Sequence, residues 1–190
     1  MQATIVVTRR VKHGADFRGG LTRYAKVRND LNHLLRDSDA AVVTTLFDYY
    51  ALPGDFPGMA TRPAADALAR VKHVQAAFAA DVGEPRFRPF IALHELEALV
   101  FSDPEPAAWA LPSGANISEI LRIRDEAGGP EAINEGPETA PSKRLARLAP
   151  GYDKVTHGPL ALASMGLAAI RARCPHFSGW IADLEAIAGR

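Results

Sequence analysis

The chain has 190 residues, which suits one domain, and 47% of them are hydrophobic, as in an ordinary globular protein. There are 22 Lys and Arg residues against 22 Asp and Glu, so the net charge of zero provides no overall attraction to nucleic acid, and any such site must be a local patch. One cysteine, Cys174, excludes a disulfide framework and a cysteine-rich zinc site, while the lack of a membrane-length apolar run or a signal-peptide layout predicts a cytoplasmic protein with no membrane partner.

The N-terminal part of the chain begins with a strand pattern and continues with a helix pattern. Ala3–Thr8 is a β-branched run typical of a buried strand, and the basic stretch 9–20 that follows predicts a loop. Thr22 is the predicted cap of a helix that runs to about Arg36. The buried face of this helix is expected to carry the apolar residues at helical spacing, namely Tyr24, Val27, Leu31, Leu34 and Leu35.

Two more strands and a helix follow. Residues 40–47 predict a strand that is buried on both faces and stops at Asp48. The stretch 48–63 is rich in proline and glycine but holds large apolar side chains, so it predicts an ordered loop. A helix is expected from Pro63 to about Val82, and residues 87–93 predict a third strand that Pro89 places at an edge or a bulge. From residue 94 the pattern becomes helical.

The alternation of strands and helices predicts an α/β fold, with a parallel sheet of three or four strands flanked by helices. The chain is expected to form a single domain over residues 1–190, with an α/β portion at 1–103 and a mainly helical portion at 104–190. Apolar spacing and punctuation by Gly and Pro predict the later helices at roughly 116–127, 139–148, 158–173 and 176–188.

Acidic side chains follow two of the predicted strands. Asp48 ends one strand, and His94, Glu95 and Glu97 follow the next. Because sites in open parallel sheets form beyond the carboxyl ends of strands, Asp48, Glu95 and Glu97 are candidate ligands of Mg²⁺ or Mn²⁺, and these three with His94 are candidate catalytic residues. Such an ion would polarise a phosphoryl oxygen or activate a water molecule. The alternative is structural: each acid caps or flanks a helix, and His94 is a cap or core residue.

Two basic segments are candidates for phosphate binding. Thr139 and Ser142 are predicted caps of a helix whose first turns would hold Lys143 and Arg144, where cations are unfavourable unless an anion such as phosphate accompanies them. Arg9 and Arg10 follow the first strand, at the sheet end predicted for Asp48, and are candidates for contact with a nucleic-acid backbone. A solvated basic face is the simpler alternative for Lys143 and Arg144.

Several segments resemble one bacterial family, catalogued as domain-of-unknown-function family 4276 and related to Toprim-like proteins. The matching segments are GGLTRYAKVRNDL, VVTTLFDYYALPGDFPG, RFRPFIALHELEALVFSDP, INEGPETAPSKRL and GYDKVTHGPLALASMGLAAIRARCPHFSGWIADLE. The resemblance implies a Toprim-like sheet, with Asp48, Glu95 and Glu97 in place of the magnesium-binding acids. It also implies action beside an ATPase of the AAA or structural-maintenance (SMC) type, in phage defence. Relatives begin with an extra strand ending in glycine and glutamate, which this sequence is expected to lack.

Three functions remain open on these grounds. The first is a metal-dependent phosphodiesterase or nuclease, inactive if the missing glutamate is essential. The second is a non-catalytic subunit that docks on an ATPase of the AAA or SMC type. Its docking surface is expected to contain apolar residues at helical spacing near the C-terminus, namely Phe177, Trp180, Ile181 and Leu184. The third is a small-molecule phosphohydrolase, the least favoured because no glycine-rich loop suited to phosphate follows any predicted strand.

Overall fold

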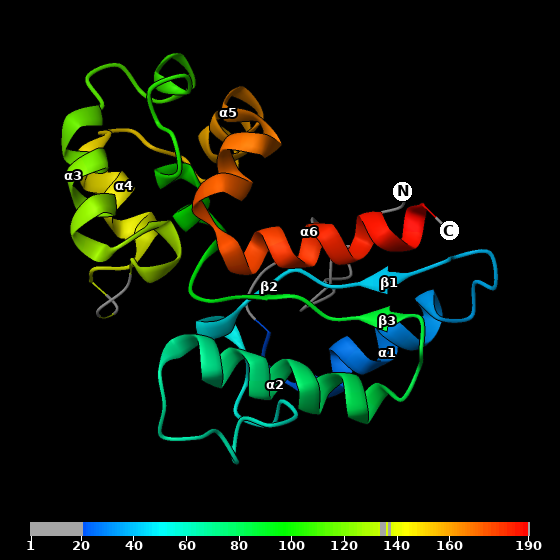
Figure 1. Cartoon of the computed structure of the whole chain (residues 1–190). Helices are drawn as coiled ribbons and strands as arrows, with labels where there is room; N and C mark the ends of the chain where they lie inside the picture. The colour runs from blue at the N-terminus through cyan, green and yellow to red at the C-terminus, as the bar shows by residue number, and fades with distance from the viewer. Residues whose placement is uncertain (1–20, 134–135, 137, 190) are drawn as a thin grey trace, which may run out of the picture. The chain divides into compact units, whose positions relative to one another are not determined.

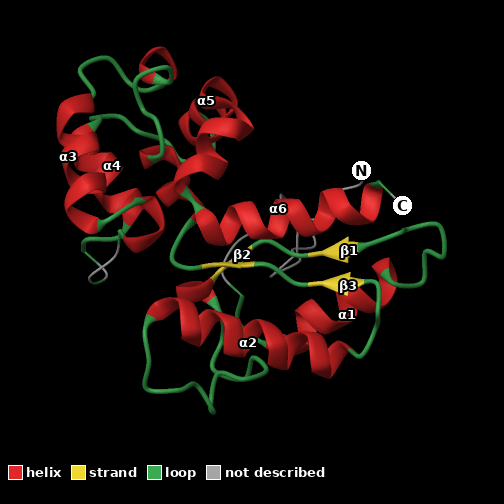
Figure 2. Cartoon of the chain, viewed as in Figure 1, coloured by secondary structure: helices red, strands yellow, loops and turns green. Residues whose placement is uncertain are grey.

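The computed structural model describes residues 21–133, 136 and 138–189 (Figure 1). Helices predominate and the strands are short (Figure 2), so the protein is of mixed α/β class, as the sequence predicted. The chain divides into two compact units, one of Met1–Ile91 with Ile187–Arg190 and one of Ala92–Ala186. The predicted strand Ala3–Thr8 lies outside the described residues. That the chain forms one domain stays a prediction.

The first unit contains parallel strands and two main helices. Its elements are α1 (Tyr24–Leu34), β1 (Val43–Thr44), β2 (Phe47–Asp48), the 3₁₀ helix η1 (Tyr49–Ala51), α2 (Ala67–Val82), β3 (Phe87–Arg88) and β4 (Ile91–Ala92), at whose Ile91 the unit ends. β1 and β3 are parallel, with Val43 opposite Phe87, and β2 pairs with β4 in a second two-stranded sheet. α2 lies between β1 and β3 in the sequence, and their parallel pairing confirms the parallel strands that the alternating pattern predicted.

The two predicted strands at 40–47 and 87–93 are each interrupted. The described strands therefore form two two-stranded sheets and not one sheet of three or four strands. At the break the Thr45 hydroxyl accepts the Phe90 N–H at 3.2 Å and lies 3.2 Å from the Phe90 carbonyl oxygen, to which it donates. Pro89 has no N–H for a ladder, so a side chain replaces the backbone bonds here. The prediction of burial on both faces is wrong for Leu46, which is 40% exposed.

An aromatic cluster holds the first unit together. Phe78 of α2 meets Phe56 of the loop after η1 at 4.7 Å between ring centroids, and Phe87 of β3 at 4.9 Å, in edge-to-face geometry. Tyr24 of α1 joins them at 5.2 Å from Phe56. Val27 and Leu31 of α1 are buried as predicted. Figures 1 and 2 show α1 and α2 on the same side of β1 and β3.

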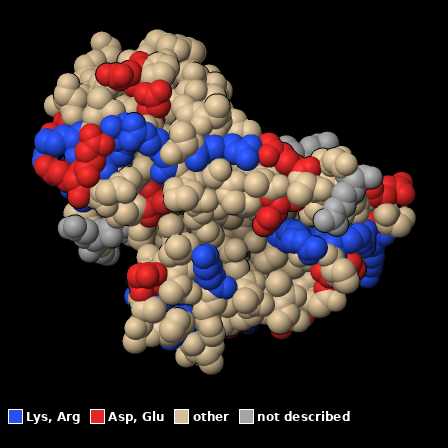
Figure 3. Space-filling model, viewed as in Figure 1, with Lys and Arg blue, Asp and Glu red and all other residues tan. Residues whose placement is uncertain are grey.

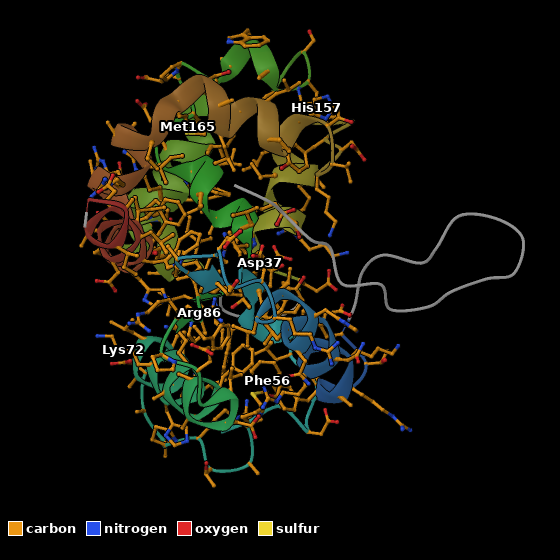
Figure 4. The ribbon with its side chains drawn as sticks, turned by 90° about the vertical axis from the view of Figure 1, so that its right-hand side faces the viewer. Asp37, Phe56, Lys72, Arg86, His157 and Met165 are labelled. Atoms are coloured by element: carbon orange, nitrogen blue, oxygen red, sulfur yellow. The ribbon has the colours of Figure 1, made fainter. Side chains whose placement is uncertain are left out.

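The loop between η1 and α2 is ordered, as predicted, and it also caps a helix. Phe56 is only 2% exposed and anchors the loop to the core (Figure 4). Asp55 accepts the backbone N–H of Tyr24 through its carboxylate at 3.0 Å, at the first residue of α1. The cap expected from Thr22 is wrong, because the Thr22 hydroxyl instead accepts a hydrogen bond from Lys26 at 3.1 Å. A carboxylate at this helix end also complements the helix dipole.

The start of α2 differs from the prediction by four residues. Pro63 was expected in its first turn, but the helix begins at Ala67. Asp66 is the N-cap, and its carboxylate accepts the N–H of Ala69 at 2.7 Å. An aspartate able to make this bond sets the helix start more strongly than the preference of proline for a first turn. Gly83 ends the helix in the left-handed conformation.

Gly58 allows the loop to approach α2 closely. Its φ is +80°, and an added Cβ would lie 2.8 Å from the Cβ of Ala77 and 3.2 Å from the Cα of Val74. We expect Gly58→Ala to lower the free energy of unfolding by about 2 kcal/mol, from backbone strain and overpacking together. Urea unfolding measures this loss. Gly54→Ala is the matched control, since no atom lies within 4 Å of that added Cβ. Equal stability of the two variants would contradict the expectation.

The second unit is mainly helical, as predicted. Its elements are the 3₁₀ helices η2 (Leu96–Phe101), η3 (Ala108–Ala110) and η4 (Pro130–Ala132) with the helices α3 (Ile117–Ala127), α4 (Pro141–Leu148), α5 (His157–Arg173) and α6 (Pro175–Ala188), whose last residues fall outside the unit. The helix expected after residue 94 is a 3₁₀ helix. η2 is the centre of the unit, because Val100 and Phe101 are fully buried and η2 packs on α3, α4, α5 and η4.

Two smaller findings concern the thiol and the membrane. Cys174 is buried, as expected of a structural cysteine, and its sulfur lies 3.2 Å from the Ser102 hydroxyl oxygen. Burial raises the pKa of this thiol to about 12, so it is not a reactive nucleophile at neutral pH. None of the described helices combines the length and hydropathy needed to cross a bilayer.

Candidate functional site

Glu95 is a buried carboxylate that binds the start of a distant helix. It lies between β4 and η2 and is 6% exposed. One of its oxygens accepts the backbone N–H of Ser142 at 2.7 Å, and the other accepts the Ser142 hydroxyl at 2.9 Å. Ser142 is the second residue of α4, where backbone N–H groups have no partner within the helix. Glu95 therefore caps α4 across 47 residues of sequence.

This contact corrects the expected capping of α4. The N-cap is Ala140, which offers no side-chain bond, and the Thr139 hydroxyl donates to the Gly136 carbonyl at 3.1 Å. Ser142 takes part, but as a donor to Glu95. An acidic side chain of the protein, that of Glu95, therefore lies at this helix start. A phosphate contact by Lys143, which is exposed, or by Arg144, whose Nε donates to the Thr139 carbonyl at 2.7 Å, stays a prediction.

Glu97 is a half-buried acid next to Glu95. Burial raises the pKa of its carboxyl above the ordinary value, the negative charge of Glu95 raises it further, and Lys154 lowers it. Glu95 is held in place beside Glu97 by its two hydrogen bonds to Ser142. Two carboxylates held together in a partly buried place are a common arrangement for sharing a proton or a cation.

The hydroxyl of Tyr152 lies in the same electrostatic environment. Its oxygen is buried and has no hydrogen-bond partner in the part of the chain that the structure describes. Burial raises the pKa of Tyr152, and the charges of Glu97 and Glu95 contribute. Gly158 leaves room for it, because an added Cβ there would lie 3.1 Å from this oxygen. A buried phenol without a partner usually signals a water molecule or ligand group that completes the site.

The raised pKa of Glu97 predicts a pH-dependent effect on stability. Since the folded state favours the protonated acid, the contribution of Glu97 to stability is full below about pH 4.5, the ordinary value, and is lost as the pH rises through the raised pKa. We therefore compare the stability of Glu97→Gln with that of the parent protein at two pH values. The difference should favour the variant more at pH 7 than at pH 4. Thermal unfolding at the two pH values measures this difference.

Glu119→Gln is the control with the opposite sign. The pKa of Glu119 is lowered by its hydrogen bonds to Arg122, so its contribution is present at neutral pH and is lost as the pH falls. Relative to the parent protein, Glu119→Gln should therefore be less stable at pH 7 than at pH 4. If Glu97→Gln showed the same direction as Glu119→Gln, the half-buried environment assigned to Glu97 would be wrong.

The other candidates are placed as follows. Asp48 is the last residue of β2, is half-buried and belongs to the first unit, so its sharing of an ion with Glu95 and Glu97 stays a prediction. His94 is half-buried between β4 and η2. Arg9 and Arg10 lie outside the described residues. Among residues 21–133, 136 and 138–189, no three His, Cys, Asp or Glu side chains form a group that could hold a metal ion by themselves.

Charges on the visible face of the second unit are interleaved. Figure 3 shows Lys and Arg among Asp and Glu over the part of the surface that carries α3. Arg122 there forms ion pairs with both Glu119 and Glu126. Such pairs neutralise a helix face that would otherwise attract a nucleic-acid backbone. This fits the zero net charge and leaves any phosphate contact to smaller groups of residues.

Sequence reasoning missed two features of this site. The capping of α4 by Glu95 joins residues 47 positions apart, so no local pattern contains it. Tyr152 was part of a polar stretch without an assigned role, and only its unpartnered hydroxyl in the folded chain distinguishes it. The HELE run at 94–97 contains both carboxylates, and their role in a functional site stays a prediction.

The comparisons with known proteins give one match. No curated protein and no solved structure matches the chain. The sequence model of the family described as Domain of unknown function (DUF4276) matches residues 1–185, which include every described candidate residue. This match confirms the resemblance drawn from the five segments. The chain belongs to the family DUF4276.

Proposed function

We propose that the protein is a divalent-cation-dependent phosphodiester hydrolase that acts on nucleic acid, built on a Toprim-like sheet. Glu95 and Glu97 would bind Mg²⁺ or Mn²⁺, with Asp48 as a further predicted ligand and His94 as a candidate proton carrier. The main support is the Glu95–Glu97 pair, because the charge of one raises the pKa of the other in a half-buried place. A divalent cation would relieve that repulsion.

The donor atoms suit such an ion. Carboxylate oxygens are the preferred ligands of Mg²⁺, which commonly uses one or two carboxylates together with phosphate oxygens of the substrate. Glu95 has an oxygen lone pair left on each atom after its bonds to Ser142. Tyr152, with its unpartnered hydroxyl, would donate to a ligand oxygen or a metal-bound water. The ion would supply charge stabilisation at the phosphoryl group and a more acidic water.

Calorimetric titration with Mn²⁺ tests the metal site. The parent protein should bind Mn²⁺, and Glu97→Gln should bind about tenfold more weakly or not at all. Glu119→Gln removes the same charge from a partly exposed position paired with Arg122 and should bind as the parent does. Equal heats of Mn²⁺ binding by the parent and Glu97→Gln would contradict the proposed metal site. Cleavage of a labelled oligonucleotide in Mn²⁺, lost in Glu97→Gln, then tests the activity.

A non-catalytic role on an ATPase of the AAA or SMC type is the second candidate, and an exposed apolar surface favours it. Trp109 of η3 is 73% exposed, Val155 76%, Leu160 of α5 44% and Leu167 of α5 46%. η3 and α5, which carry three of these residues, pack on each other. The C-terminal surface expected for docking is less suitable, because Phe177 is only 8% exposed. Such exposure is typical of a surface that meets a partner.

A binding experiment with purified proteins separates the two functions. An ATPase of this type encoded beside the gene should bind the parent chain, and Trp109→Ser should weaken binding while leaving Mn²⁺ affinity unchanged. Glu105→Gln, which changes an exposed residue near η3, is the control. Binding that is the same for the parent and Trp109→Ser would exclude this surface.

A further inference from the structure

The first unit contains a pocket lined by two arginines. Its volume is about 480 Å³, and its walls come from η1, the following loop and α2. The lining residues are Tyr49, Met59, Ala60, Arg62, Pro63 and Arg70. No carboxylate is among them. This size is within the range of ligand sites, and the polar lining suits a negatively charged occupant.

Arg70 of α2 is the most unusual of these residues. The Nε of its guanidinium is buried and has no hydrogen-bond partner among the described residues. Within the described residues it forms no ion pair with a carboxylate. A buried charged donor without an acceptor is costly, and native structures rarely keep one without a ligand or water to satisfy it.

Arg62 and Tyr49 present further donors. The Nε of Arg62 donates to the Met59 carbonyl at 2.7 Å, and its Nη1 donates to the Tyr49 hydroxyl oxygen at 3.2 Å. These bonds orient the guanidinium and leave its second terminal nitrogen for a ligand. Because the phenol oxygen accepts from Arg62, the hydrogen of the Tyr49 hydroxyl is available for a ligand acceptor. The pocket therefore offers two guanidinium groups, of which that of Arg62 is oriented by hydrogen bonds, and a hydroxyl.

The walls are rigid enough to hold these donors in place. The loop that carries Arg62 is anchored by Phe56 and by the close contact of Gly58 with α2. The Thr61 hydroxyl also lies 2.9 Å from the Nε2 of His73 on that helix. Donors that are positioned before the ligand arrives cost less ordering entropy on binding.

We propose that this pocket binds the terminal phosphate of a nucleotide or oligonucleotide. Two guanidinium groups match the double charge and several oxygens of a phosphate monoester better than a single carboxylate. The volume exceeds what a free phosphate needs, which leaves space for the attached sugar. The pocket belongs to the first unit, and its lining contains neither Asp48, Glu95 nor Glu97 of the proposed metal site.

Calorimetry on the full chain, with EDTA present, tests the pocket without the metal site. The probes are inorganic phosphate, acetate, and a short oligonucleotide with and without a 5′-phosphate. Phosphate should bind and acetate should not, and the 5′-phosphate should strengthen oligonucleotide binding by about tenfold. Arg70→Gln should abolish that gain. Lys72→Gln removes the same charge from an exposed residue of α2 outside the pocket (Figure 4) and should retain it.

Several outcomes would overturn the assignment. Equal binding of phosphorylated and unphosphorylated oligonucleotides would show that the pocket does not read a terminal phosphate. Unchanged binding by Arg70→Gln would place any phosphate elsewhere. Because the Arg70 side chain makes no hydrogen bond within the described protein, Arg70→Gln should fold, which circular dichroism checks. Arg62→Gln is the second variant and should give the same loss.

Discussion

Arg86→Ala is expected to lower the free energy of unfolding of the protein by about 3 kcal/mol. The Arg86 guanidinium donates to three backbone carbonyls, those of Leu35 at 2.8 Å, Asp37 at 2.8 Å and Ala40 at 3.1 Å. The side chain thereby ties the end of α1 and the following turn to β3, as can be followed from Asp37 and Arg86 in Figure 4. Charged donors to carbonyls contribute more than neutral ones, and losing them leaves acceptors unsatisfied.

Conservative replacement and a surface control sharpen this test. Arg86→Lys retains the charge but not the planar fork that reaches three acceptors, so we expect a loss of about 2 kcal/mol. Arg36→Ala, at an exposed side chain, should change stability by less than about 0.5 kcal/mol. Urea unfolding followed by circular dichroism gives the values, and amide exchange in β1 and β3 locates the effect. An Arg86→Ala protein as stable as Arg36→Ala would show that the three bonds contribute little.

Arg86 also shows what the sequence could and could not predict. The helices α3, α5 and α6 begin and end within a residue or two of their predicted bounds, because apolar spacing and local punctuation are contained in the segments themselves. The Asn116 side chain caps α3, and Gly128 ends it, both from adjacent positions. No local signal in residues 35–40 indicates that their carbonyls are bound by an arginine some 50 positions later.

The same reasoning explains the errors at helix starts. α1 and α4 are capped by Asp55 and Glu95, which lie 31 and 47 positions away from their partners. Local caps at Thr22 and Thr139 were therefore expected and are absent. The strands were predicted as continuous because their apolar runs are continuous, whereas at the break Pro89 lacks a ladder N–H and the Thr45 hydroxyl bonds to Phe90 instead. Tertiary contacts decided each of these points.

The candidate site was predicted in part for a related reason. The sequence identified Glu95 and Glu97 as acids that follow a strand, and the electrostatics within the second unit support their pairing. The alternative that a carboxylate serves as a helix cap also applies, because Glu95 does cap α4. Both descriptions hold for one side chain. The Arg62–Arg70 pocket was missed, since the two arginines were not near any predicted strand end.

Glu95→Ala is expected to lower the free energy of unfolding by about 3 kcal/mol, because it leaves the Ser142 N–H and hydroxyl without an acceptor in a buried place. Glu95→Gln should lose only about 1 kcal/mol, since its amide oxygen can accept the N–H and its amide nitrogen can donate to the hydroxyl. Glu105→Ala, at an exposed acid, is the control. Both tryptophans, at 109 and 180, belong to the second unit, so their fluorescence during urea unfolding measures the effect there.

The difference between these two variants separates capping from metal binding. Glu95→Gln keeps the cap but removes the charge, so the pKa of Glu97 should fall toward its ordinary value as its negative neighbour is lost. If Glu95 is also a ligand, the same variant should bind Mn²⁺ about tenfold more weakly while remaining nearly as stable as the parent. If Glu95 only caps α4, Mn²⁺ affinity should survive in Glu95→Gln and depend on Glu97 alone. A Glu95→Ala protein as stable as Glu105→Ala would contradict the capping itself, because two hydrogen bonds to a helix start cannot be lost from a buried position without cost.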